Sequence, residues 1–178
     1  MKIHFIIFFL TFAVNINLYS QENKSFHSIN SIILNGKDLS FGMSSADFIT
    51  DFPEFKKYDP DEFHILGSDT ELQYEVYSYI YRKDINIREF DPFEDMYVIF
   101  LKFKDYSLKE LEMFSGHSDE GYAIADSILN QFTLLKKEPD DNLEFEKLFY
   151  SKGNLEATSY YYETLNLTIK SINQVSSD

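Results

Sequence analysis

Hydrophobic and polar positions divide this chain into short segments, most of which predict β-strands. After a polar stretch at 21–30, the apolar run 31–34 is followed by Asn35-Gly36 and by a second short run at 37–41. Asn-Gly between two such runs is the strongest short-range signal for a two-residue β-hairpin, because both residues accept positive φ angles. The sequence therefore predicts that the folded domain opens with a hairpin.

A short helix is expected to follow the hairpin. Asp47 follows Ser44 at the spacing of a capping box, and Met43 and Phe48 stand at the positions of a hydrophobic staple. Pro53 lacks the amide proton that a continuing helix needs. We therefore expect the helix to begin at Ser44 and to end before Pro53.

The region 71–82 shows the clearest strand periodicity, after a segment at 54–70 that is expected to be mostly loop. Successive side chains of a strand point to opposite faces of the sheet, so residues two apart share a face. One face of this strand combines polar residues with tyrosines. That face holds Gln73, Glu75, Tyr77, Tyr79 and Tyr81, and the other holds Leu72, Tyr74, Val76, Ser78 and Ile80.

Two further strands are predicted on either side of a turn at Asp105-Tyr106. The segment 96–104 contains the unbroken apolar run Val-Ile-Phe-Leu, which is typical of a strand buried on both faces near the middle of a sheet. The segment 107–114 is expected to pair with it through the turn.

One long helix is expected between Ser118 and Pro139. Ser118 and the two acidic residues after it suit a helix N-terminus, while Lys136 and Lys137 suit the negative end of the helix dipole. Between them, apolar residues recur at helical spacing and polar residues occupy the opposite face. The apolar positions are Tyr122, Ala125, Ile128, Leu129, Phe132 and Leu135, with Asp126 and Gln131 expected to be exposed.

Three last strands are predicted at 143–150, 155–162 and 165–172. The element order is then hairpin, helix, strands, helix, strands, with short connections. This order indicates the α+β class: an antiparallel β-sheet meander with one short and one long helix packed on one face. Two helix-plus-strands units of roughly 70 residues would fit a duplication, although no matching residues support one.

The first twenty residues are predicted to be an export signal. Lys2 supplies the positive start, an apolar run follows at 5–10, and the small residue Ser20 stands at cleavage distance. A membrane anchor is the alternative, but the strongly apolar part is shorter than the roughly 20 residues that span a bilayer. We expect a mature chain that begins at Gln21 and is periplasmic or secreted.

The resulting division of the chain is a signal peptide at 1–20, a flexible lead at 21–30, a single α+β domain at 31–173 and a tail at 174–178. With no cysteine, the chain has no disulfide, no lipid-attachment site and no thiol chemistry. Its 18 Phe and 13 Tyr supply a large apolar core instead. A formal charge of −14 without a basic stripe argues against binding nucleic acid or anionic membranes and favours a basic partner.

The stretch Ile33–Phe48 resembles the opening of small bacterial domains in which a strand ends in Gly-Met-Ser and a capped helix follows. Its residues are I-L-N-G-K-D-L-S-F-G-M-S-S-A-D-F. Similar groups are the SmpA/OmlA-type outer-membrane assembly proteins with the related fold of the beta-lactamase inhibitor proteins, and an uncharacterised bacterial domain family that opens with an Asn-Gly-Lys hairpin. The resemblance implies a non-enzymatic protein that works by contact with another protein.

Ser115, His117 and Asp119 bring together the three residue types of a hydrolytic triad. Triads converge in space rather than along the chain, and no Gly-x-Ser-x-Gly turn is present to expose a nucleophile. Ser118 and the acids around it are better explained as a helix cap. We therefore predict no catalytic residue and no cofactor.

Two acidic groups offer the oxygen ligands that calcium prefers, one between Asp59 and His64 and one at Asp91, Glu94 and Asp95. Neither has the spacing of a known calcium loop or of a zinc helix. Solvated loops are the expected interpretation and no metal site is predicted, although calcium binding at Asp59–His64 stays open.

The alternating residues Tyr77, Tyr79 and Tyr81 are the candidate partner-binding residues. Tyrosine suits any half-buried pleated surface, but it is also enriched at protein interfaces. If the late strands join the same sheet, Tyr160 and Tyr162 are expected beside them.

The function that the sequence favours is an exported, soluble, non-catalytic protein-binding module, such as an envelope interaction factor or an inhibitor-like protein. The alternatives are an exported hydrolase with a dispersed acidic or histidine-containing site, and a structural component without a specific partner. The partner's identity and the oligomeric state are not specified by the sequence.

Overall fold

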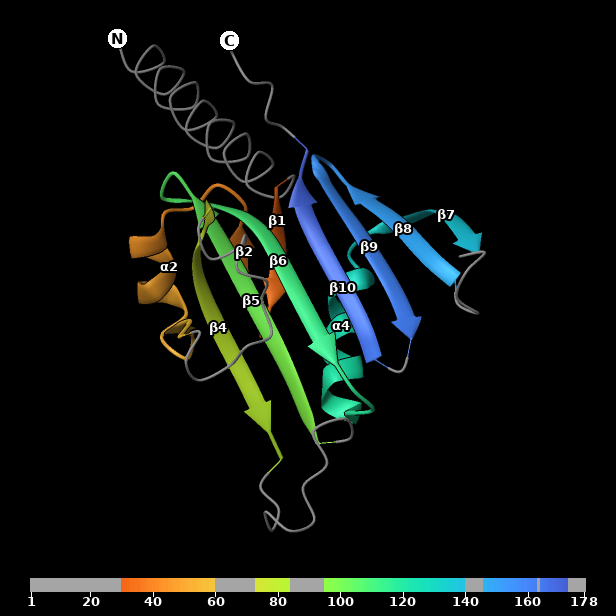
Figure 1. Cartoon of the computed structure of the whole chain (residues 1–178). Helices are drawn as coiled ribbons and strands as arrows, with labels where there is room; N and C mark the ends of the chain where they lie inside the picture. Colours follow the sequence, from red (N-terminus) through yellow and green to blue (C-terminus); the bar gives the residue numbers. More distant parts are fainter. Residues whose placement is uncertain (1–29, 60–72, 84–94, 140–145, 163, 173–178) are drawn as a thin grey trace, which may run out of the picture.

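Antiparallel strands dominate the structure, a computed structural model that describes residues 30–59, 73–83, 95–139, 146–162 and 164–172. In these residues an eight-stranded sheet is accompanied by a two-stranded hairpin and two helices (Figure 1). The predicted α+β class is therefore correct, with strand as the larger part. The predicted signal peptide, nearly all of the lead, and the tail lie outside the described residues.

The predicted hairpin is confirmed. Strands β1 (Ser31–Leu34) and β2 (Lys37–Ser40) pair antiparallel through the Asn-Gly turn. Both turn residues have positive φ angles, 51° at Asn35 and 76° at Gly36, as a two-residue turn of this kind requires.

The predicted short helix is confirmed as α2 (Ser45–Asp51). The Ser44 Oγ accepts a hydrogen bond of 3.1 Å from the Asp47 amide and donates one of 2.7 Å to the Asp47 carboxylate. The helix ends at Phe52, directly before Pro53. Its buried residue, Phe48, belongs to the main hydrophobic cluster.

The large sheet consists of two four-strand units. Within each unit, strands that are consecutive in sequence are neighbours, and the units meet where β6 pairs antiparallel with β10. α2 precedes the first unit and α4 (Asp119–Leu129) the second. The first unit is β3 (Lys56–Lys57), β4 (Glu75–Arg82), β5 (Met96–Lys104) and β6 (Ser107–Ser115); the second is β7 (Thr133–Pro139), β8 (Glu146–Lys152), β9 (Leu155–Tyr162) and β10 (Thr164–Ser171).

The prediction of a single long helix up to Pro139 is wrong in its second half. α4 stops after Leu129, and the segment that was expected to continue it forms β7, which pairs with β8. The apolar spacing up to Leu135 led to this error. A helix needs an apolar surface to pack against along its whole apolar face, whereas Leu135 is 60% exposed at the sheet edge. Pairing with β8 therefore overrides a helical pattern that has nothing to pack against.

Gln131 was expected on an exposed helix face and instead contacts the hairpin. Its side-chain amide accepts a hydrogen bond of 2.7 Å from the Ile33 amide and donates one of 3.0 Å to the Ile33 carbonyl. The side chain thus satisfies the outer edge of β1 as a neighbouring strand would. Phe132, the next residue, is half-buried against the main cluster from the turn after α4.

The two faces of the sheet carry different cores. The main hydrophobic cluster combines the hairpin, Phe48 of α2, Ala125 and Ile128 of α4, and one face of strands β4, β5, β6, β9 and β10. A smaller cluster around Val76, Val98 and Phe100 lies on the opposite face. The predicted alternation in β4 is confirmed, because its tyrosines pack in or against the main cluster while Val76 and Ile80 pack in or against the smaller one. The predicted burial of β5 on both faces is confirmed as well.

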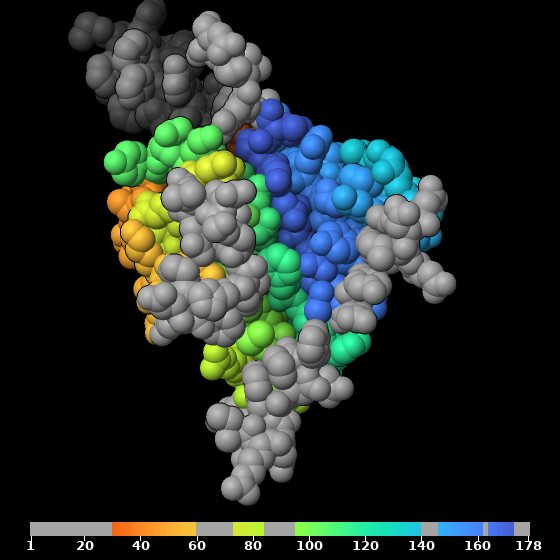
Figure 2. Space-filling view, in the orientation of Figure 1, coloured from red at the N-terminus to blue at the C-terminus, as the bar shows by residue number. Residues whose placement is uncertain are grey.

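A buried charge network joins the two four-strand units on the face of Phe100. The Lys102 ammonium lies 2.9 Å from Glu110 and 2.7 Å from Glu112, and Lys170 of β10 lies 2.8 Å from Glu110 of β6. Burial alone would raise the pKa of Glu110, but hydrogen bonds from Lys170 and Lys102 lower it. Burial, aided by the proximity of Glu110, raises the pKa of Glu112 despite its hydrogen bond with Lys102. In Figure 2, strands β8 to β10 of the second unit form the blue part of the surface.

Candidate protein-binding surface

The three candidate tyrosines of β4 differ in exposure. Tyr77 is only 6% exposed; its ring packs edge-on against Phe48 and Phe103, and its hydroxyl donates to Glu75. Tyr79 and Tyr81 are half-buried and pack against the border of the main cluster. Tyr77 thus supports the strand from the core, and only Tyr79 and Tyr81 offer surface to a partner.

Tyr81 is the first residue of a row of paired residues that runs across the sheet from β4 to β9. Strand register places Tyr81 opposite Tyr97, Tyr97 opposite Ser115, and Ser115 opposite Leu165. Tyr161 of β9 then stands opposite Leu165. The Tyr81 and Tyr97 rings stack with centroids 4.9 Å apart and planes within 13°. This row brings tyrosines from both four-strand units to the same level of one sheet face.

The N-terminus of α4 rests on the middle of this row. The Ser118 Oγ caps the helix by accepting a hydrogen bond of 3.2 Å from the Gly121 amide. A Cβ atom at Gly121 would lie 2.1 Å from the Ser115 Oγ and 3.1 Å from the Tyr97 Cβ. Only glycine therefore lets the first turn of α4 approach β5 and β6 this closely.

On the other side of this helix end, Tyr161 is 43% exposed. Its hydroxyl lies 3.1 Å from the Nδ1 atom of His117, and its ring centroid lies 6.2 Å from that of Tyr122. The prediction that Tyr160 lies beside the β4 tyrosines is wrong, and the side chain of Tyr162, the other residue of that prediction, lies outside the described part of the structure. Tyr160 is opposite Asn166 and so faces away from the row that holds Tyr161, because a shift of one residue reverses the face of a strand side chain.

Acidic residues of α4 lie beside Tyr81. The Tyr81 hydroxyl donates a hydrogen bond of 3.4 Å to the exposed Glu120 carboxylate, and Asp119 is exposed in the same helical turn. Burial raises the pKa of Tyr97, and burial with the nearby Glu120 charge raises that of Tyr81. Burial and the hydrogen bond with Tyr161 raise the pKa of Tyr122. These phenols therefore stay protonated at neutral pH and act as hydrogen-bond donors.

The structure does not assemble the hydrolytic residue types near α4 into a triad. Ser115 is 1% exposed, and its Oγ has no hydrogen-bond partner within the described part of the chain. His117 contacts Tyr161, while Asp119 lies in the first turn of α4. Among the described residues, no group of three His, Cys, Asp or Glu side chains is close enough to hold a metal ion. Most of the Asp59–His64 and Asp91–Asp95 acidic groups lie outside them.

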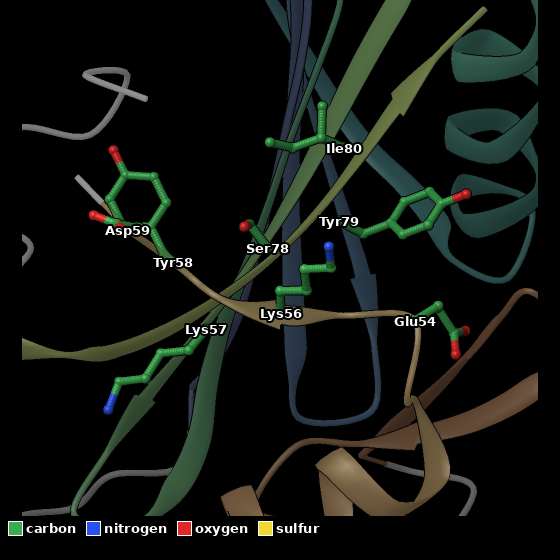
Figure 3. A pocket seen from close by; sticks show the side chains of 8 residues that line it. All are labelled: Glu54, Lys56, Lys57, Tyr58, Asp59, Ser78, Tyr79 and Ile80. Carbon is green, nitrogen blue, oxygen red and sulfur yellow. The ribbon is translucent and has the colours of Figure 1, made fainter. Parts of the chain in front are cut away.

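A cavity of about 200 Å³ lies at the edge of the sheet beside Tyr79. Its lining mixes both signs of charge with aromatic and aliphatic groups (Figure 3). The lining residues are Glu54, Lys56, Lys57, Tyr58, Asp59, Ser78, Tyr79 and Ile80.

Sequence reasoning identified Tyr79 and Tyr81 but missed the residues that complete the surface. Tyr97 was assigned only to a buried strand, and Tyr161 was overlooked in favour of its neighbours. Strand register, which a single sequence does not specify, is what brings them together. Gly121 was the one residue that could have indicated this surface, since a glycine in the first turn of a helix commonly marks a close approach of the helix to a neighbouring element.

Comparison with known proteins adds little to this description. No protein-family model and no curated protein matches the chain. Among solved structures, it is similar to the crystal structure of a DUF4309 family protein (YjgB) from Bacillus subtilis subsp. subtilis str. 168. The two are 13% identical over 79% of this chain and 82% of that chain, with a TM-score of 0.34. At this TM-score the likeness carries no argument about function.

No helix in the described residues combines the length and the apolar character needed to cross a bilayer.

Proposed function

We propose that the chain is an exported, non-catalytic protein-binding module whose partner contacts Tyr79 and Tyr81. The observation that carries this proposal is the position of the two tyrosines, which are half-buried on β4, the strand next to the edge strand β3, and are backed by the core residues Tyr77 and Tyr97. Aromatic side chains that are already held in place lose little conformational freedom on binding. They therefore suit a recognition surface.

The carboxylate beside Tyr81 and the net charge of the chain favour a basic partner. Glu120 accepts from Tyr81 while remaining exposed, and the whole chain carries a formal charge of −14. Such a field speeds the approach of a positively charged surface and repels an acidic one. This supports the function predicted from the sequence, in which the module acts by contact within the bacterial envelope.

The alternative of an exported hydrolase has one supporting observation, the buried carboxylate pair Glu110 and Glu112 with oppositely shifted pKa values. Such pairs can divide the roles of acid and base. Here, however, Lys102 binds both carboxylates and Lys170 binds Glu110 as well. A network of this kind is satisfied within the protein, so the binding function is preferred.

Site-specific photo-crosslinking in the native envelope tests the proposed function. A benzoylphenylalanine replaces Tyr81 in one variant and Tyr106 in another; Tyr106 is 81% exposed on the β5–β6 turn and serves as the control. We expect a discrete adduct from position 81 and none from position 106. Equal adducts from both positions, or none from position 81, would contradict the proposal.

Substitution gives the strength of the contact. Tyr81→Ala should weaken capture of the crosslinked partner about thirtyfold, since an interface hot spot contributes about 2 kcal/mol or more. Tyr106→Ala should leave capture unchanged. Circular dichroism of both variants establishes that the fold is retained.

A further inference from the structure

The short strand β3 covers only part of β4's outer edge. Lys56 is opposite Ser78 and Lys57 is opposite Tyr77, and the Tyr58 amide donates a 2.9 Å hydrogen bond to the Val76 carbonyl. Before Lys56 the chain leaves the sheet edge, because Phe55 turns into the core and packs on Phe48 and Tyr79. β4 itself continues to Arg82.

The direction of the backbone groups follows from these hydrogen bonds. In a strand, the N–H and C=O of one residue point to the same side, and the next residue points to the other side. The Val76 carbonyl points toward β3, whereas the Lys83 amide donates to Asp95 on the β5 side. The backbone N–H and C=O groups of the even-numbered β4 residues therefore point away from β5. After those of Ser78, the next groups on this outer side are those of Ile80. Within the described ranges no strand is paired with it on that side.

The cavity of about 200 Å³ lies at this place, where Ser78, Tyr79 and Ile80 of β4 meet Lys56 of β3. Tyr79 and Ile80 point to opposite sides of β4 (Figure 3). An extended chain laid along this edge would meet both side chains at once. Its side chains would face alternately the tyrosine side and the Ile80 side.

We propose that the partner's contact segment is an extended peptide that adds to the sheet as a strand, continuing the line of β3 and pairing with the outward backbone of Ile80. This rests on the proposed function and specifies how that surface binds. Main-chain hydrogen bonds give such strand addition its affinity, and alternate side chains give it specificity. On the tyrosine side, Tyr79, Tyr81 and the exposed Glu120 select a lysine or an arginine at alternate positions.

The probe for this test is the acetylated, amidated peptide Thr-Val-Lys-Val-Lys-Val-Thr. Its lysines share one face and its valines the other, which matches the tyrosine side and the Ile80 side of β4. Two N-methylated versions accompany it, one methylated at both lysines and one at the three valines. N-methylation removes the amide donors of one edge of the peptide and leaves all side chains in place.

Titration calorimetry with the full mature protein measures the affinities. Strand addition presents only one edge of the peptide to β4, so one methylated version should bind at least tenfold more weakly while the other stays within threefold of the parent. Because Ile80→Pro removes the outward amide and leaves the β5 side unchanged, it should reproduce the loss, with Ile80→Ala as the side-chain control. A peptide with glutamates in place of the lysines should bind more weakly than the parent.

The outcomes separate the mode of binding from the function. If Tyr81→Ala weakens binding of the parent peptide but neither methylated version differs from it, strand addition is wrong and the tyrosine surface stands. If the parent peptide does not bind, or if both methylated versions bind equally, strand addition is also wrong. Binding of the parent that Tyr81→Ala leaves unchanged would exclude the tyrosine surface itself.

Discussion

The two edges of the eight-stranded sheet are protected to different degrees. β7 has a register shift at Leu135, two consecutive lysines and a terminal proline, which are features by which edge strands avoid pairing with other chains. At the other edge, among the described residues, the terminal strand is β3, whose two residues are both lysines and which covers only Tyr77 and Ser78 of β4. The rest of that side belongs to β4, which pairs with β5 in unbroken register and whose sequence, Glu-Val-Tyr-Ser-Tyr-Ile-Tyr-Arg, has neither lysine nor proline. A strand side with high strand propensity that, in the described residues, is covered by only a two-residue strand is a hazard unless it serves a purpose. The contrast therefore favours a functional role for the β4 edge.

The edges also differ in how firmly they are attached. Every residue of β7 is exposed, whereas Val76, Tyr77 and Ser78 of β4 are buried. β4 is fixed on its tyrosine side by the aromatic residues of α2 and the segment after it. A binding edge benefits from this rigidity because less conformational freedom is lost on association.

The largest effect on the free energy of unfolding is expected where Phe48 of α2 packs on β4. Phe48 is fully buried and contacts Phe52, Tyr77 and Phe103 with ring centroids 5.2 to 5.5 Å apart. Phe48→Ala should lower the free energy of unfolding by about 3 to 5 kcal/mol, while Leu135→Ala in β7 should change it by less than about 0.5 kcal/mol. Urea denaturation measures both. Similar losses at the two sites would remove the distinction between a fixed edge and a loosely attached one.

A smaller loss of stability is expected from changes at the junction of the two four-strand units, where β6 pairs with β10. Within the described residues, Glu110 forms ion pairs with Lys102 of the first unit and with Lys170 of the second, whereas Glu112 forms one with Lys102. At pH 7, Glu110→Gln should cost about 1 to 3 kcal/mol of unfolding free energy, and Glu112→Gln should cost less. Thermal and urea unfolding of the two variants check this order, and the reverse order would contradict it.

The pH dependence follows from the directions of the pKa shifts. The pKa of Glu110 is lowered from 4.5 in the folded state, so its contribution is present above pH 4.5 and is lost as the pH falls through the folded value. Glu110→Gln should therefore lose less stability on acidification than the wild type. The pKa of Glu112 is raised, so protonation of this carboxyl favours the folded state as the pH falls. Glu112→Gln should accordingly lose more stability than the wild type on acidification.

Local sequence signals were sufficient for the elements that depend on neighbouring residues. Asn35-Gly36 determined the hairpin, and Ser44 with Asp47 determined the start of α2. The alternation in β4 assigned each side chain to the correct face. In each case the signal and the structure involve residues fewer than ten positions apart.

Features that depend on distant residues were not predictable in the same way. The end of α4 depends on β8, which accepts β7 as a neighbour, and the local apolar spacing contained no sign of that competition. Tyr161 joins the tyrosine row only through the registers of β9, β10 and β6. Within the described residues, no strand pairs with the outer side of Ile80, because Phe55 packs into the core and β3 is only two residues long.

The smallest effect on stability is expected from removing the protective residues of β7. This change is also the most direct test of the contrast between the two edges. Lys137→Val combined with Pro139→Val removes one charge and restores one backbone donor on an exposed strand. Stability should change by less than about 0.5 kcal/mol, because both side chains lie at the surface. Self-association should nevertheless increase, since a charge and a proline at a sheet edge act mainly against pairing with a second copy. Sedimentation velocity over a range of concentrations measures it, with Lys104→Val, which removes an exposed lysine from an inner strand, as the control. A double variant that sediments as the wild type does would show that these residues do not protect β7, and the contrast between β7 and the outer side of β4 would then no longer favour a functional role for β4.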